Sequence, residues 1–183
     1  QIIANVEQVD DPTSALADLK PGMLDLLDAE GAAVVIGDHV TRVGQTPGDA
    51  EIRELSQWIA ANRPGDLFAT DHLREHYGTG LLGSVASGVL LISLGATRPH
   101  QLLWFRTEQT RTVEWAGDPA KSVAKGSEEV RLSQRGSFAL WKETVQGRSR
   151  PWSPLEIEAA MHLRDGLTRQ LLRRAEQLAI ANR

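Results

Sequence analysis

Residues 86–115 read ASGVLLISLGATRPHQLLWFRTEQTRTVEW, and this stretch decides the fold class. Apolar runs at about 86–94 and 101–106 are separated by a turn that contains Gly and Pro, and a third run follows at 110–115. Connections this short join antiparallel strands, because a parallel crossover needs about a dozen residues or more. The stretch therefore predicts three consecutive strands of an antiparallel sheet.

Three further strands are predicted upstream of this stretch. Residues 31–36 (GAAVVI) and 39–43 (HVTRV) are joined by Gly37-Asp38, a pair typical of a tight hairpin turn. A short apolar run at 67–70 indicates another strand, bounded by polar and Gly residues.

Helical segments alternate with these strands. Residues 1–28 are predicted to be helical, with a break at Pro21-Gly22. A second helix is expected over about 46–61, and a third, capped by Asp71, over about 71–77. This order predicts an α+β fold in which an antiparallel sheet carries helices on one face.

A long helix is predicted at the C-terminal end of the chain. It starts at Ser153-Pro154 and runs to about residue 182, with apolar residues at every third or fourth position. Its 28 or so residues span about 40 Å at 1.5 Å per residue, which exceeds the length that one small domain can cover. We therefore expect its second half to pack against the same helix of a second copy, giving a homodimer.

Between the last strand and this helix lies a polar segment that does not read as core. Residues 118–134 show no helical period, and ordinary loops run to about six residues, so a connection this long predicts a functional arm. Six of the nine aromatic residues of the chain flank it: Trp104, Phe105, Trp115, Phe138, Trp141 and Trp152. We expect Trp104, Phe105 and Trp152 to be core residues, and the other three to form an interface with another domain.

The totals limit the class of protein. A length of 183 residues suits one domain, and the absence of cysteine excludes disulfides and thiolate metal sites and fits a reducing compartment such as the cytoplasm. The longest apolar run, Val89–Leu94, is far shorter than the roughly 20 residues of a membrane helix. Because the chain starts at Gln1 without an initiator Met, we expect it to be a segment of a longer protein.

Six motifs are distributed over the second half of the chain: Leu103-Trp104-Phe105-Arg106-x-Glu108, Trp115-Ala116-Gly117, Arg135-x-Ser137-Phe138, Trp141-Lys142-Glu143, Gly147-Arg148-Ser149-x-Pro151-Trp152 and Glu156-Ile157-Glu158-Ala159-Ala160. Together, in this order, they resemble the PHY domain of bacterial phytochromes, the red-light-sensing family. The family usually has Pro where this chain has Thr107 and Gln134.

The resemblance implies that residues 1–183 form a single PHY domain with a GAF-like body. It implies a tongue at about 115–145 and an output helix at about 154–182. The implied function is a non-enzymatic signal relay that stabilises the photoactivated state of a neighbouring bilin. The tongue would contact an upstream PAS-GAF module that carries a biliverdin-type bilin, and the helix would drive an output module, most often a histidine kinase. The domain itself would bind no cofactor or metal.

The resemblance also assigns roles to residues of the tongue. Arg135 would pair with an Asp of the GAF domain in the dark state, Ser137 would make a related contact in the light state, and Trp115 would change its packing. The expected contact residues are Trp115, Ala116, Gly117, Arg135, Ser137, Phe138 and Trp141.

Two other functions stay open from the sequence. A GAF-like body is compatible with a sensor of a small ligand such as a cyclic nucleotide. A DNA-binding regulator is conceivable because residues 131–183 hold ten Lys and Arg against five Asp and Glu, although the apolar stripe on the last helix favours self-association.

Two further patterns have ordinary structural explanations. Gly78-x-Gly80-x-x-Gly83 matches a dinucleotide fingerprint by letter, but a helix is expected before it and a strand after it, the reverse of the required order. His72 and His76 are spaced like zinc ligands but have no evident third ligand, so a surface pair is expected.

Overall fold

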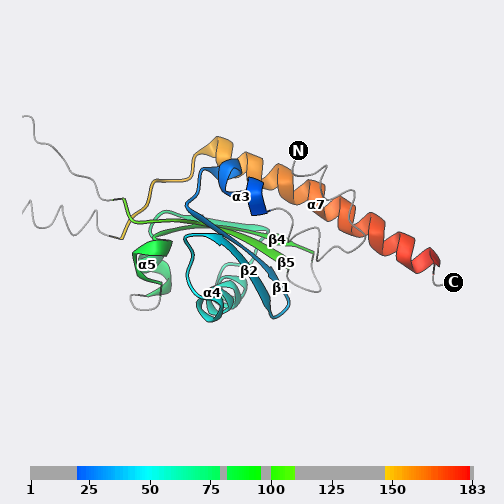
Figure 1. Cartoon of the computed structure of the whole chain (residues 1–183), viewed down its shortest axis with the longest axis horizontal. Helices are drawn as coiled ribbons and strands as arrows, with labels where there is room; N and C mark the ends of the chain where they lie inside the picture. Colours follow the sequence, from blue (N-terminus) through cyan, green and yellow to red (C-terminus); the bar gives the residue numbers. More distant parts are fainter. Residues whose placement is uncertain (1–19, 79–81, 96–99, 110–146, 182–183) are drawn as a thin grey trace, which may run out of the picture.

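A five-stranded antiparallel sheet in the order β2-β1-β5-β4-β3 forms the centre of the molecule. The computed structural model describes residues 20–78, 82–95, 100–109 and 147–181. The strands are β1 (Gly31–Ile36), β2 (His39–Gly44), β3 (Leu67–Thr70), β4 (Gly88–Leu94) and β5 (His100–Arg106). The helices are α3 (Lys20–Leu27), α4 (Asp49–Asn62), α5 (Leu73–Tyr77), the 3₁₀ turn η1 (Gly83–Ala86) and α7 (Pro154–Ala181) (Figure 1).

The predicted strands within the described residues are confirmed, and so is the antiparallel sheet. The β1–β2 hairpin turns through Gly37-Asp38 with Ile36 opposite His39, and Gly37 has a left-handed φ of 58°, which such two-residue loops require. The strand predicted at 110–115 lies outside the described residues. In the part of the chain that the structure describes, β5 is central because it pairs with β1 on one side and β4 on the other.

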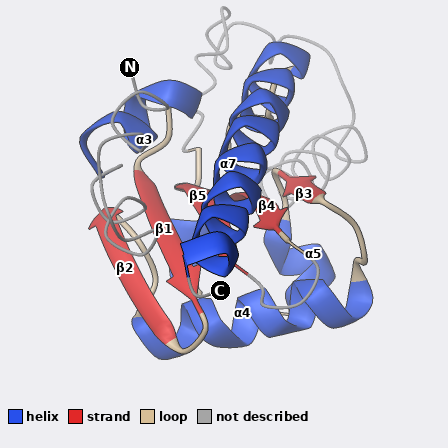
Figure 2. Cartoon of the chain, turned by 90° about the vertical axis from the view of Figure 1, so that its right-hand side faces the viewer, coloured by secondary structure: helices blue, strands red, loops and turns tan. Residues whose placement is uncertain are grey.

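Helices cover both faces of the sheet, so the prediction of helices on one face is wrong. Helices α3 and α7 lie on one face, and α4 and α5 lie on the other (Figures 1 and 2). The physical reason is visible in β4 and β5, whose side chains are nearly all buried on both sides. Strands that are continuously apolar need cover on both faces, whereas a strand with one wet face alternates apolar and polar residues.

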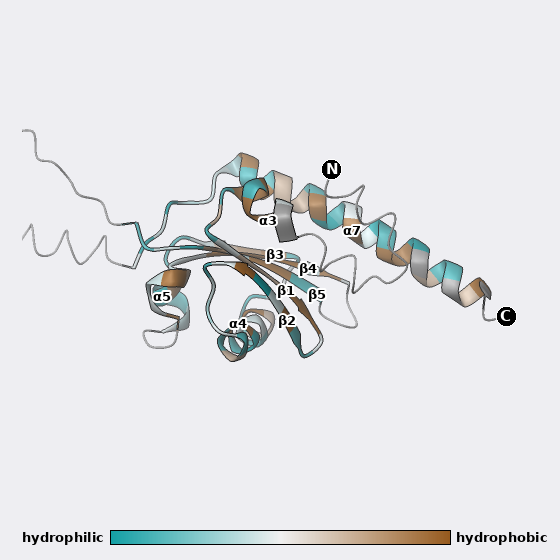
Figure 3. Ribbon diagram, viewed as in Figure 1, coloured by the Kyte–Doolittle hydropathy of each residue, from teal (hydrophilic) through white to brown (hydrophobic). Residues whose placement is uncertain are grey.

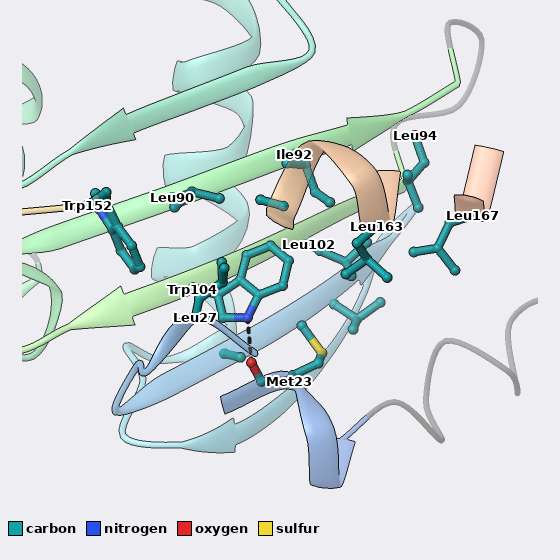
Figure 4. Packing of buried hydrophobic residues seen from close by; sticks show 13 residues of the cluster. Met23, Leu27, Leu90, Ile92, Leu94, Leu102, Trp104, Trp152, Leu163 and Leu167 are labelled. Atoms are coloured by element: carbon teal, nitrogen blue, oxygen red, sulfur yellow. Dashed lines mark hydrogen bonds between the residues drawn. The ribbon is translucent and has the colours of Figure 1, made fainter. Parts of the chain in front are cut away.

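Alternate residues of the strands divide between two hydrophobic clusters. The cluster under α3 and α7 contains Met23, Leu27, Ala32, Val34, Leu90, Ile92, Leu94, Leu102, Trp104, Trp152, Ala160, Leu163 and Leu167 (Figure 4). The cluster under α4 and α5 contains Ala33, Val35, Ile52, Leu55, Ile59, Leu73, Ala86, Val89, Leu91, Leu103 and Phe105. The predictions that Trp104, Phe105 and Trp152 are core residues are therefore confirmed.

The largest side chain at the centre of the first cluster is Trp104, which is completely buried. Its indole Nε1 donates a hydrogen bond of 2.8 Å to the carbonyl oxygen of Met23, drawn as a dashed line in Figure 4. A buried indole N–H needs such a partner. The bond fixes helix α3 on the sheet.

Two predicted helix boundaries need correction. Within the described residues, helix α3 (Lys20–Leu27) passes through Pro21-Gly22 without the predicted break, and residues 1–19 of the predicted helix lie outside them. Helix α5 begins at Leu73 with His72 at the N-cap position, so Asp71 is not the cap. The Asp71 carboxylate instead accepts a hydrogen bond of 2.6 Å from His72 Nδ1.

The long helix α7 is confirmed, and its two halves have different surroundings. Ala160, Leu163 and Leu167 in its first half are buried against the sheet, whereas Leu172 and Ile180 are 60% and 73% exposed. Apolar and polar residues alternate along the helix as far as its C-terminal end (Figure 3). In the described parts of the chain, neither this helix nor another one is long and apolar enough to cross a bilayer.

Candidate functional site at the root of the arm

The predicted arm lies between the two described segments 100–109 and 147–181. All seven predicted contact residues, Trp115, Ala116, Gly117, Arg135, Ser137, Phe138 and Trp141, lie outside the described residues. The structure does describe both flanks of the arm, residues 106–109 and 147–153. We call these two flanks the arm root.

The two flanks of the arm root are hydrogen-bonded to each other. The Gln109 N–H donates to the carbonyl oxygen of Arg148 at 2.8 Å, and the Gly147 N–H donates to the Glu108 carboxylate. The Glu108 N–H in turn donates to the carbonyl oxygen of Ser84 at 2.8 Å. The chain therefore leaves the body and returns to it at one place, at the left of Figure 1.

The returning flank is fastened to the edge of the body. The Ser149 N–H donates to the carbonyl oxygen of Asp71 at 2.8 Å, and the Trp152 Nε1 donates to that of Thr70 at 3.1 Å. Ser149 is buried against Gly88 so closely that a Cβ at position 88 would overlap the serine hydroxyl. This close approach explains why position 88, at the start of a strand, is glycine.

Arg106, the last residue of β5, is the best-satisfied polar group of the site. Its side chain is 1% exposed, and each of its five N–H groups has an acceptor. Its guanidinium also lies 3.7 Å from the centre of the Trp152 ring, a cation–π contact. The acceptors are the carbonyl oxygens of Leu27 (2.6 Å), Asp28 (3.3 Å), Arg150 (3.4 Å) and Pro151 (2.8 Å) and the carboxylate of Glu156 (2.6 Å).

Glu156 connects Arg106 to the first turn of α7. Its carboxylate accepts from the Ser153 N–H at 2.8 Å, while the Ser153 hydroxyl accepts from the Glu156 N–H at 3.3 Å, which is a capping box. Burial raises the pKa of this carboxyl, but the hydrogen bonds from Arg106 and Ser153 and the charge of Arg106 outweigh it and leave the pKa below its usual value. Glu156 is thus a carboxylate at neutral pH.

The two histidines that are spaced like zinc ligands stack on each other beside the arm root. Their ring centres are 4.8 Å apart, and His72 also approaches the carboxylate of Glu75 at 3.8 Å. Burial, His72 and Arg63 together lower the pKa of His76. Among the described residues, no group of three or more His, Cys, Asp or Glu is arranged to hold a metal ion.

The described residues around the glycine-rich segment line a small cavity of about 90 Å³. Pockets for cofactor-sized ligands hold about 300–1,000 Å³, so this cavity does not suit a cyclic nucleotide. Helix α5 precedes the segment, and the 3₁₀ turn η1 and then strand β4 follow it, whereas a dinucleotide site needs a strand before the segment and an α-helix after it. Its lining residues are Leu73, Arg74, Gly78, Leu82, Gly83, Ala86, Ser87 and Gly147.

Arg106, Glu156 and Ser149 have no predicted role, although all three belong to the motifs quoted above. One signal was available for Glu156, because Ser153-x-x-Glu156 before an apolar run has the pattern of a capping box. For Arg106 the signal was a cation at the end of a continuous apolar strand. Such a residue is rarely buried without a partner, but the sequence does not say which partner it has.

Comparison with known proteins gives a consistent match. A family profile described as PHY, phytochrome region, matches residues 1–176. Cyanobacterial phytochrome B of Nostoc sp. is 40% identical over the full length of this chain, and a bacteriophytochrome of Xanthomonas campestris pv. campestris is 34% identical over 81% of it. The chain spans about a quarter of the length of these relatives, 24% and 25% respectively.

A solved structure also resembles this one along most of the chain. It is the crystal structure of bacteriophytochrome RpBphP3 from the photosynthetic bacterium R. palustris, with a TM-score of 0.64 and 29% sequence identity. The similarity covers 95% of this chain and 35% of that chain.

Proposed function

Since the chain belongs to the phytochrome family, as its PHY region, we propose that it is the signal-relay domain of a red/far-red photoreceptor. In this proposal, residues at about 115–145 form a tongue that contacts an upstream PAS-GAF module, which binds a biliverdin-type bilin. The tongue stabilises the photoactivated state, and α7 passes the change to an output module. The domain contributes no catalytic group and binds no bilin itself.

The observation that supports the proposal most strongly is the construction of the arm root. A segment that is fastened at both ends, through Gln109 with Arg148 and Gly147 with Glu108, can change its own conformation while the body stays folded. The returning flank leads directly into α7 after residue 153. A rearrangement of the arm therefore has a short covalent route to the output helix.

The roles of the tongue residues follow from the resemblance. We propose that Arg135 forms a bidentate ion pair with an Asp of the GAF domain in the dark state, since the planar guanidinium matches a carboxylate. Ser137 takes a related contact in the light state. Trp115, Phe138 and Trp141 anchor the tongue on its neighbour, together with the backbone at Ala116 and Gly117.

The output side of the proposal rests on α7. Leu172 and Ile180 are exposed on the half of the helix that extends past the buried contacts of Leu163 and Leu167, which suits packing against the same helix of a second copy. We propose a homodimer with a histidine kinase as the downstream module. A cysteine-free chain fits a location in the cytoplasm.

Replacing Arg135 with Ala in the full-length receptor tests the tongue assignment. The expected result is a destabilised photostate with an altered rate of dark reversion, measured by absorbance, and an unchanged melting temperature of this domain. Arg131→Ala, in the same segment, is the matched control and should leave dark reversion unchanged. If Arg135→Ala reverts like the wild type, Arg135 is not the tongue contact.

A second experiment tests whether the chromophore belongs to another domain. The isolated chain, mixed with biliverdin, should give no stable red-absorbing adduct. Appearance of such an adduct would make this chain a chromophore-binding domain and contradict the proposed division of roles.

A further inference from the structure

Arg106 belongs to the first flank of the arm, and its side chain contacts the second flank. Arg106 itself stands three positions before Gln109, where the first flank ends, and Arg150 and Pro151 belong to the second flank. The carbonyl oxygens of Arg150 and Pro151 accept hydrogen bonds from Arg106 Nη1 at 3.4 Å and 2.8 Å. A shift of the returning flank therefore changes the hydrogen bonds of this guanidinium directly.

The same guanidinium also holds two helices. Its Nη2 donates to the carbonyl oxygen of Leu27, at the end of α3, and to the carboxylate of Glu156, in the first turn of α7, both at 2.6 Å. Its Nε donates to the carbonyl oxygen of Asp28, which has a left-handed φ of 47°. The end of α3, the first turn of α7 and the returning flank of the arm are thus joined at one side chain.

The burial of Arg106 makes the loss of any of its acceptors costly. All five of its N–H groups are used, and at 1% exposure water cannot replace a lost acceptor. Glu156 supplies the negative charge at 2.6 Å that a buried guanidinium needs, so the two groups must move together or separate at a high cost. Trp152 stacks on the guanidinium at 3.7 Å and ties the returning flank to the same position.

We propose that Arg106 is the positioning residue that couples the root of the arm to helix α7, and that Glu156 is the group on the helix through which it acts. The proposal rests on the relay function described above. When the arm rearranges, the returning flank displaces acceptors of Arg106, and the ion pair with Glu156 transmits this displacement to the first turn of α7. Without the ion pair, the arm responds but the helix does not follow.

Hydrogen exchange in the full-length receptor, measured by mass spectrometry in the dark and after red light, tests this coupling. The variant is Glu156→Gln, which keeps an oxygen acceptor for Arg106 and removes the charge. The matched control is Glu158→Gln, on the same helix, where the side chain is 67% exposed. The wild type and the control should show light-dependent exchange both in residues 110–146 and in the first turns of α7.

In Glu156→Gln, the light-dependent change in residues 110–146 should persist while the change in α7 is lost. A purely structural role would lower the melting temperature but leave the light-dependent difference in α7, so a folded Glu156→Gln receptor with the wild-type response in α7 would overturn the coupling alone. Absence of a response in residues 110–146 of the wild type would instead overturn the relay function, and the coupling with it.

If Glu156→Gln does not fold, Arg150→Gln provides the second test. Arg150 is 44% exposed and links Glu156, at 3.6 Å, to Asp28, at 2.7 Å, so its removal loosens the junction from the outside. The expected result is a reduced light response of α7 with an intact response in residues 110–146. An undiminished response in α7 would overturn the coupling.

Discussion

Replacing Arg106 with Met should destabilise this chain more than any exposed charge replacement. Met fills most of the volume but leaves the Glu156 carboxylate without its partner at 2.6 Å and the buried Leu27 carbonyl without its donor. Breaking a buried ion pair from one side costs about 3–5 kcal/mol. For a domain of this length, each kcal/mol lowers the melting temperature by about 2–4 °C.

The assay is urea unfolding of the chain followed by circular dichroism, with Arg42→Met as the control. Arg42 also forms an ion pair of 2.6 Å, with Asp49, but its side chain is 44% exposed, so its loss should cost at most about 1 kcal/mol. If Arg106→Met lost no more free energy of unfolding than Arg42→Met, the guanidinium would not be the buried junction described above.

The pH dependence of the same pair supplies a separate check on Glu156. Its pKa in the folded chain lies below the ordinary value of 4.5, so the charged form stabilises the folded state above that pH. The stability difference between the wild type and Glu156→Gln should be constant near neutral pH. It should shrink as the pH falls below about 4.5, through the lowered pKa. A difference that grew on acidification would contradict the assignment.

Three further predictions test separate parts of the structure. Gly88→Ala should lower the free energy of unfolding by about 1–3 kcal/mol because the added methyl overlaps the Ser149 hydroxyl, and Ser149→Gly in the same chain should restore part of it, as measured by urea unfolding. The lowered pKa of His76 means that the unfolded chain binds a proton more readily than the folded chain, so the wild type loses stability as the pH falls below about 6.5. His76→Gln should lose less stability over the same pH range in urea unfolding. A loss as large as that of the wild type would contradict this. Leu163→Ala should cost about 2–5 kcal/mol in thermal or urea unfolding, because Leu163 is buried. Leu172→Ala should change the stability of the monomer by less than about 0.5 kcal/mol, because Leu172 is exposed, and equal losses would contradict the different burial of these two side chains.

The sheet and its helices were largely readable from the sequence, because each signal was local. The Gly37-Asp38 turn between two apolar runs gave the first hairpin, and Ser153-Pro154 before a periodic apolar pattern gave the start of α7. The distribution of helices over the two faces was mispredicted, although the continuous apolar character of β4 and β5 was visible. That character requires cover on both sides, and which helix covers which side depends on contacts between distant segments.

The candidate site was predictable in a different way. The arm was inferred from an aperiodic polar stretch between aromatic residues, and its contact residues came from motifs that resemble a known family. They lie in 110–146, outside the described residues, so they stay predictions. The arm root was not predicted as a structure, because the hydrogen bond from the Gln109 N–H to the Arg148 carbonyl oxygen joins residues that are far apart in the sequence.

By itself, the sequence determined the five described strands, the long last helix and the family, since periodicity, turn residues and motifs are properties of neighbouring positions; the arm stays a prediction. The tertiary structure alone decided what Arg106 does. Its five acceptors come from the end of α3, the returning flank and the first turn of α7, which meet only when the sheet and both helices have packed. A buried guanidinium selects its partners by burial and geometry in three dimensions, and no local pattern encodes that choice.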